Sequence, residues 1–97
     1  MRDMEKKAKF ENLNVWKESL NLSVDIFKLS KHWQEYGLKD QIQRSSLSVP
    51  SNIAEGYDRD SKKEFIRFLN IAKASCSELR TQLYISNEIG LIDDEMS

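Results

Sequence analysis

Glycine, proline and cysteine are all scarce in this chain of 97 residues, which contains three Gly, one Pro and one Cys. So few turn-forming residues exclude the many tight turns of an all-β fold, and they favour a few long helices. The single cysteine, Cys76, excludes an intramolecular disulfide and gives no sign of an oxidising compartment. The chain is therefore expected to be all-α.

Long apolar runs are also absent. No stretch approaches the roughly 18 consecutive apolar residues of a membrane span, and the N-terminal MRDMEKKAKF lacks the apolar core of a signal peptide. We therefore expect a single cytoplasmic domain over residues 1–97, without a membrane partner. A domain of this size buries only about 60–65% of its unfolded surface, so contacts between subunits would add to a marginal core.

Neither sign of charge dominates, because 15 basic and 16 acidic side chains give a net charge of −1. After Arg80 the chain has four acidic residues and no Lys or Arg, so residues 1–80 carry 15 basic and 12 acidic side chains. This bias is smaller than that of a dedicated nucleic-acid-binding domain. Local basic patches are still compatible with it.

Histidine, like cysteine, is nearly missing. His32 is the only histidine, and with one His and one Cys the chain cannot form a usual structural zinc site. We interpret His32 as an exposed side chain near a helix C-terminus and Cys76 as a small buried residue. No pair of carboxylates suggests a general acid and base. The sequence therefore predicts no enzymatic activity, no metal or cofactor, and no small-molecule substrate.

Helical periodicity is clear in two segments before residue 60. The first runs from about 13 to 33, with Asn12 as its expected N-cap and Gly37 as the residue that ends this unit. The second runs from about 38 to 57 and contains Pro50. Because an interior proline removes a backbone hydrogen bond, we expect a kink there.

A third helix is predicted over about 61–89. It starts with a capping box, Ser61 to Glu64, and Gly90 should end it. The residues of its packing face are spaced alternately four and three apart, which is the heptad seam of near-parallel helices. They are Phe65, Leu69, Ala72, Cys76, Leu79, Leu83 and Ser86. A fourth helix is expected to begin at about residue 93. The predicted fold is an antiparallel up-down bundle of the four-helix-bundle type, with its fourth helix missing or truncated.

The second helix carries an unusual polar stripe at helical spacing: Gln41, Ser45, Ser48, Asn52 and Glu55. In one interpretation, the small serines let two helices approach while the larger residues form hydrogen bonds between helices or subunits. In the other, the stripe lines a polar groove or pore that contacts a ligand or RNA.

Basic residues gather in the third helix and the turn before it: Arg59, Lys62, Lys63, Arg67, Lys73 and Arg80, with Arg44 nearby. Acidic residues interrupt this set, so it is either a solvated helix face or a modest phosphate-contact surface. An oligomer would repeat such a surface several times.

The stretch QIQRSSLSVPSNIAEG, residues 41–56, resembles the signature of bacterial four-helix-bundle proteins named after intervening sequences of the 23S rRNA gene. Flanking residues 10–16, 36–38, 65–72 and 75–79 agree with it. By this resemblance the signature positions are Gln41, Arg44, Ser48, Pro50, Asn52, Glu55 and Gly56.

The resemblance implies a four-helix bundle that assembles as a pentameric ring and has no established enzymatic activity. A related branch consists of accessory proteins of diversity-generating retroelements, which bind a reverse transcriptase and nucleic acid. We therefore expect a homo-oligomeric binding module associated with RNA or a nucleic-acid-processing protein. The alternative is a protein–protein scaffold without nucleic-acid affinity.

Overall fold

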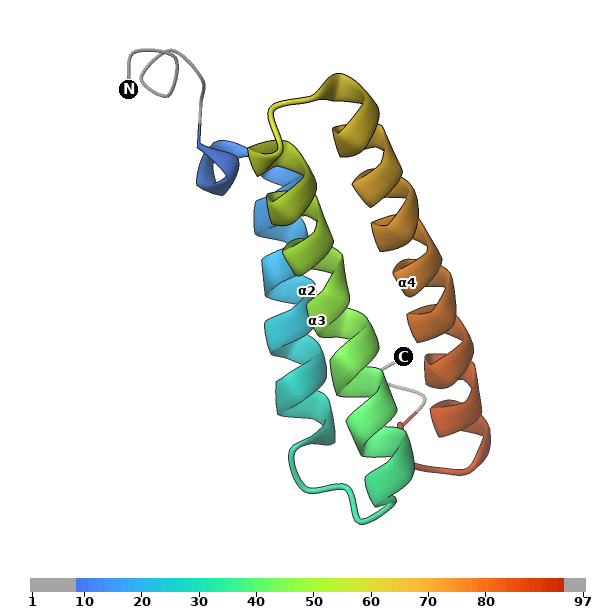
Figure 1. The fold of residues 1–97 in the computed structure, drawn as a ribbon. Coiled ribbons are helices and arrows are strands. Elements are labelled where there is room, and N and C mark those ends of the chain that lie inside the picture. The colour runs from blue at the N-terminus through green and yellow to red at the C-terminus, as the bar shows by residue number, and fades with distance from the viewer. Residues whose placement is uncertain (1–8, 94–97) are drawn as a thin grey trace.

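Three α-helices follow one another, each antiparallel to the next, with a short 3-10 helix before the first (Figure 1). The computed structural model describes residues 9–93. The elements are η1 (Phe10–Asn12), α2 (Asn14–Ser30), α3 (Tyr36–Asp58) and α4 (Lys62–Glu88). The predicted all-α, up-down bundle is confirmed. Asp93 is not helical, and the expected fourth helix falls on residues 94–97, which lie outside the described part of the chain.

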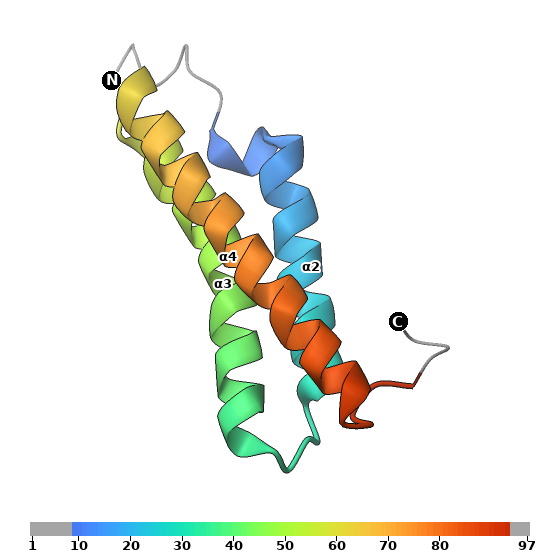
Figure 2. The ribbon, with the colours of Figure 1, turned by 90° about the vertical axis from the view of Figure 1, so that its right-hand side faces the viewer.

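Helix α3 is the centre of the bundle. It contacts both α2 and α4, whereas within residues 9–93 no residue of α2 comes within 8 Å of α4 between Cα atoms. Figure 2 shows α4 crossing in front of α3, with α2 to the right of α3. One core cluster contains Ile26, Ile42, Leu79 and Ile92, so it draws on every α-helix and on the segment after α4.

Serines, rather than large apolar residues, form much of the contact between α2 and α3. The hydroxyls of Ser23 and Ser46 lie 3.3 Å apart. Gln43 donates from Nε2 to the Ser30 hydroxyl at 3.0 Å. These three serines are buried, and each has a hydrogen-bond partner, as buried polar groups require. Small side chains therefore let the two backbones approach without leaving unpaired polar atoms.

Gly56 serves a similar purpose where α3 meets α4. A Cβ atom at this position would lie under 3.0 Å from the Cβ of Phe68 and 3.1 Å from its Cγ. Phe68 is itself buried. The close approach of the two helices at this end therefore requires glycine.

Two predicted helix ends are wrong. Asn12 is not an N-cap: it closes η1, and the N-cap of α2 is Leu13, which makes no side-chain capping bond. Gly37 does not end the first unit, because it is the second residue of α3. Helix α2 ends at Ser30, and Trp33 in the following connection is buried in the core. An apolar residue at helical spacing thus lies outside the helix and still packs.

Both ends of α4 are close to the prediction. The Ser61 hydroxyl accepts from the Glu64 amide at 3.3 Å, which is half of the capping box. The Glu64 carboxylate binds Arg67 in place of the Ser61 amide. Gly90 has φ +85°, and the amide of Leu91 donates to the carbonyl of Ser86 at 2.9 Å. This is a Schellman motif, for which glycine is the favoured residue.

Pro50 lies inside α3, as predicted, and is buried. Its ring nitrogen cannot donate to the carbonyl of Ser46. The nearby hydroxyls of Ser46 and Ser48 donate to the carbonyls of Gln43 and Ser45, and not to the carbonyl of Ser46. The expected kink stays a prediction.

Candidate nucleic-acid interface

Two residues of the polar stripe of α3, Ser45 and Ser48, form hydrogen bonds to α4. Ser45 donates to Oε1 of Glu78 at 3.2 Å, and Ser48 is hydrogen-bonded to Ser75. Asn52 donates from Nδ2 to the carbonyl of Ser48 at 2.7 Å, within its own helix. For Ser45 and Ser48 the contacts favour the interpretation that the stripe joins helices.

The remaining signature residues fall into two groups. Pro50 and Gly56 are buried and shape the packing of α3. Gln41, Arg44 and Glu55 are exposed. Arg44 pairs with Asp40 and Glu55 with Arg59, each at 3.0 Å and one helical turn apart. Such exposed pairs contribute little to stability.

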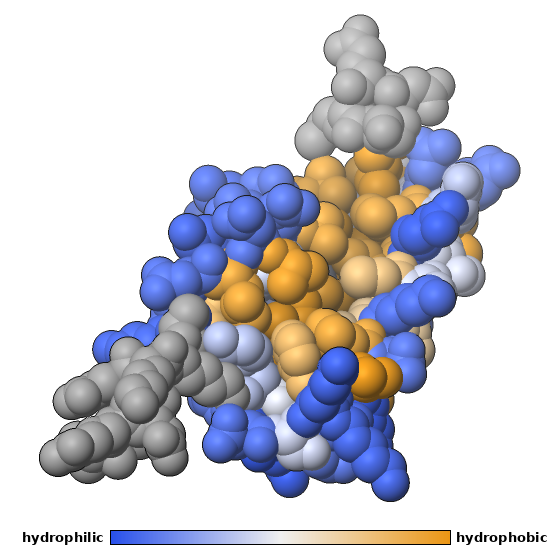
Figure 3. All heavy atoms as spheres, turned by 90° about the horizontal axis from the view of Figure 1, so that it is seen from above, coloured by the Kyte–Doolittle hydropathy of each residue, from blue (hydrophilic) through white to orange (hydrophobic). Residues whose placement is uncertain are grey.

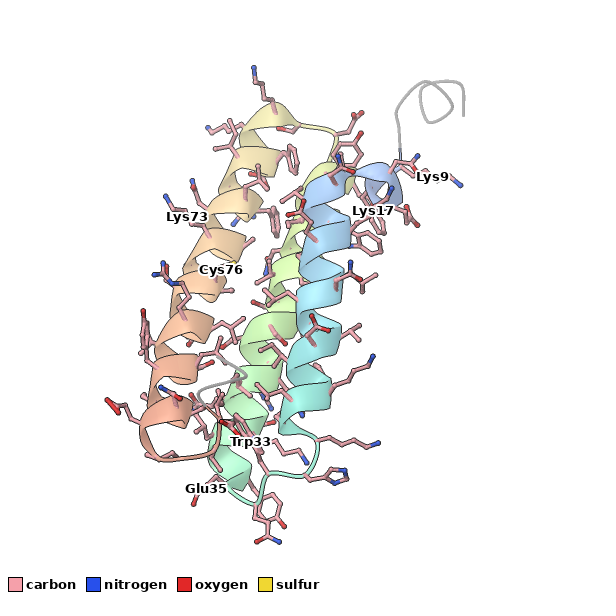
Figure 4. All side chains as sticks on the ribbon, turned by 180° about the vertical axis from the view of Figure 1, so that it is seen from behind. Lys9, Lys17, Trp33, Glu35, Lys73 and Cys76 are labelled. Carbon is pink, nitrogen blue, oxygen red and sulfur yellow. The ribbon has the colours of Figure 1, made fainter. Side chains whose placement is uncertain are left out.

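The six basic residues predicted as nucleic-acid contacts do not form one surface. At 100° per residue, Lys62, Lys73 and Arg80 fall within about 20° of one another on α4, over a length of about 27 Å. All three are exposed, and none forms an ion pair among the described residues. Figure 4 shows Lys73 pointing away from the other two helices. We call these three residues the α4 basic edge.

Arg59 and Arg67 belong to a different cluster. Their guanidinium carbons lie 5.0 and 4.5 Å from the ring centroid of Phe68. Arg59 also pairs with Glu55, and Arg67 with Glu64. Because each guanidinium is already occupied by a ring and a carboxylate, this cluster is better suited to holding the α3–α4 turn than to binding phosphate.

The pKa of Glu64 reflects that arrangement. The side-chain hydrogen bond from Arg67 holds this pKa below its usual value of 4.5, and the charge of Arg59 adds a smaller effect in the same direction.

Lys63, the remaining predicted contact, is exposed and lies about 100° around the helix from Lys62. It therefore lies apart from the α4 basic edge.

Between α2 and α4 the surface is hollowed into an open groove of about 790 Å³, which we call the α2/α4 groove. Ile26 and Leu29 of α2, Leu83 of α4 and Ile92 supply its apolar lining, and Lys28 and Arg80 are among its charged residues. Figure 3 shows apolar residues gathered between hydrophilic sides at one end of the bundle.

The heptad seam of α4 explains part of this groove. Ala72, Leu79 and Ser86 are buried, whereas Leu69, Cys76 and Leu83 are only partly buried. The contact with α3 therefore covers only part of the seam, and Leu69, Cys76 and Leu83 keep some of their surface exposed. The Oδ1 atom of Asn87, another lining residue, is buried without a hydrogen-bond partner in the described residues.

Residues 9–93 contain no cluster of metal ligands and no helix that could cross a membrane. Within that range no three His, Cys, Asp or Glu side chains are placed to hold a metal ion. No described helix is both long and apolar enough to span a bilayer. His32 is exposed, and Cys76 is partly buried beside Val49, Ile53 and Ala72.

The sequence singles out the basic residues but does not reveal the buried serines of α2 or the aromatic residue that follows Arg80. The buried serines of α2 are polar, so a pattern of apolar residues does not predict them as core positions. Tyr84 was not named, although it follows Arg80 by one turn and is 68% exposed. The spacing of four between a cation and an aromatic residue was the available signal.

A comparison with protein families finds a match over residues 11–97 to the family described as 23S rRNA-intervening sequence protein. A comparison with curated proteins gives no match.

Proposed function

The chain belongs to the family of 23S rRNA-intervening sequence proteins, and from this premise we propose that it is a non-enzymatic, homo-oligomeric module that binds RNA. The observation that carries the proposal is the α4 basic edge, where Lys62, Lys73 and Arg80 are aligned and free of carboxylate partners among the described residues. Aligned cations along one helix follow a phosphate backbone better than a mixed-charge surface does.

Oligomerisation supports this function because three cations per subunit are few. Repetition around a pentameric ring, the assembly implied by the family resemblance, would place five basic edges on one particle. Apolar surface for such contacts is available. Leu20, Val24 and Phe27 follow one another at helical spacing on α2, and each is 40–42% exposed.

Salt dependence of RNA affinity tests the proposal. Fluorescence anisotropy with a labelled single-stranded RNA should give a log–log slope of about −0.7 per phosphate contact. Replacing Lys62, Lys73 and Arg80 by Gln removes three cations, so the slope should become shallower by about 2.

The matched control removes three exposed lysines elsewhere: Lys9, Lys17 and Lys31, each changed to Gln. It alters the net charge equally but leaves the α4 basic edge intact, so its slope should stay near that of the parent chain. Equal loss in both variants would mean that only net charge matters. Affinity that does not change with salt would contradict the proposal outright.

A protein–protein scaffold is the second candidate, and the α2/α4 groove favours it. In this apolar groove the buried Asn87 oxygen has no hydrogen-bond partner among residues 9–93, which suits another helix that supplies a donor. A chain that retains a partner protein but does not bind RNA at any salt concentration would support the scaffold. Light scattering on the same sample measures the mass, and a monomer would contradict the ring.

A further inference from the structure

A second, smaller hollow lies on α4. Its volume is about 250 Å³, and Ser77, Arg80, Thr81 and Tyr84 line it. Tyr84 presents 68% of its surface to solvent. Because most of this ring is exposed, its packing within the bundle contributes little to stability, but the ring offers a flat face for stacking.

The hollow is distinct from the α2/α4 groove, although Arg80 and Tyr84 border both. Ser77 and Thr81 lie about 60° and 100° around α4 from Arg80, whereas Leu83 in the groove lies about 60° in the opposite direction. A helix seated in the groove would therefore leave the Ser77–Thr81 side open.

The side chains of the hollow suit one nucleotide. Unpaired bases stack on exposed aromatic rings, and an arginine beside the ring can hold the adjacent phosphate. Thr81 donates its hydroxyl to the carbonyl of Ser77 at 3.1 Å, so its oxygen is left to accept. The Ser77 hydroxyl can donate or accept, so different base edges would be tolerated.

We propose that this hollow binds an unpaired nucleobase, which stacks on Tyr84 while Arg80 contacts its phosphate. The inference rests on the proposed RNA binding and adds to it a preference for single-stranded over duplex RNA. Lys73 lies two turns before Arg80, about 10.5 Å along the helix, and would hold the backbone further along. Duplex RNA, whose bases are already stacked, would gain nothing from Tyr84.

The test compares Tyr84→Ala, Tyr84→Phe and the parent chain. Each is titrated by anisotropy against a labelled single-stranded oligouridine and against a duplex of equal length. We expect Tyr84→Ala to weaken single-strand affinity by about 5- to 100-fold, with duplex affinity and the salt slope unchanged. Tyr84→Phe, which keeps the ring, should stay within about 2-fold of the parent.

Tyr36→Ala is the matched control, because Tyr36 is 69% exposed but lies at the start of α3, one turn before Asp40. It should leave both affinities unchanged. If the parent binds RNA and Tyr84→Ala has no effect, or weakens single strand and duplex equally, the inference is overturned while the proposed function stands. Loss of subunit association in Tyr84→Ala would also overturn it, since the ring would then be a protein contact. A parent chain that binds neither RNA contradicts both.

Discussion

Substitution of Gly56 by alanine tests whether the close approach of α3 and α4 is a requirement of packing. The added Cβ would meet the Cβ and Cγ of buried Phe68, which are close to the backbone and cannot swing away. Overpacking of this kind costs about 1–3 kcal/mol, and alanine returns up to about 1 kcal/mol through its helix propensity. We expect a net destabilisation of about 1–2 kcal/mol. For a domain of this size, that lowers the melting temperature by about 5–15 °C.

Gly37→Ala is the control within the same helix. A Cβ at Gly37 meets nothing within 4 Å, so alanine should stabilise the chain by about 0.5–1 kcal/mol. Both variants are melted at one protein concentration and followed by circular dichroism at about 222 nm, where helix content is read. The reasoning is refuted if Gly56→Ala raises the melting temperature as Gly37→Ala does.

Two further predictions concern the N-terminus of α4. Ser61→Ala removes the hydroxyl that accepts from the Glu64 amide, so urea unfolding should show a loss of about 1 kcal/mol; an unchanged midpoint would mean that the cap contributes nothing. Glu64→Gln removes a carboxylate whose folded-state pKa is lowered by Arg67. A lowered folded pKa gives stability that is fully present above the unfolded pKa and is lost as pH falls through the folded value. The variant should therefore be less stable than the parent at neutral pH and should match it in acid, and a stability difference that persists in acid would contradict the assignment.

The sequence predicted α4 more accurately than the other helices because its ends carry local chemistry. Ser61 and Gly90 act through hydrogen bonds within a few residues, so their effect is visible in the sequence. Gly37 misled the prediction since glycine alone does not distinguish a helix stop from a first turn. Gly90 has a positive φ, whereas Gly37 is helical. That difference depends on the path of the whole chain.

The candidate interface was only partly predictable for a similar reason. The sequence placed Arg67 and Arg80 in one basic set, and helix geometry separates them. Arg67 is further removed from that set by Glu64 and by the ring of Phe68, which the fold presents to it. The residue types identified the chemistry, while the partners of each cation became visible only in three dimensions.

The central position of α3 also has a consequence for how the chain folds. Every contact between two α-helices in residues 9–93 joins neighbours in the sequence, and η1 adds a contact with α3. The connections are short: residues 31–35 between α2 and α3, and residues 59–61 between α3 and α4. Closing such loops costs little chain entropy, and topologies dominated by local contacts are the ones that fold fastest. The two helical hairpins share α3, so neither hairpin can form without this helix.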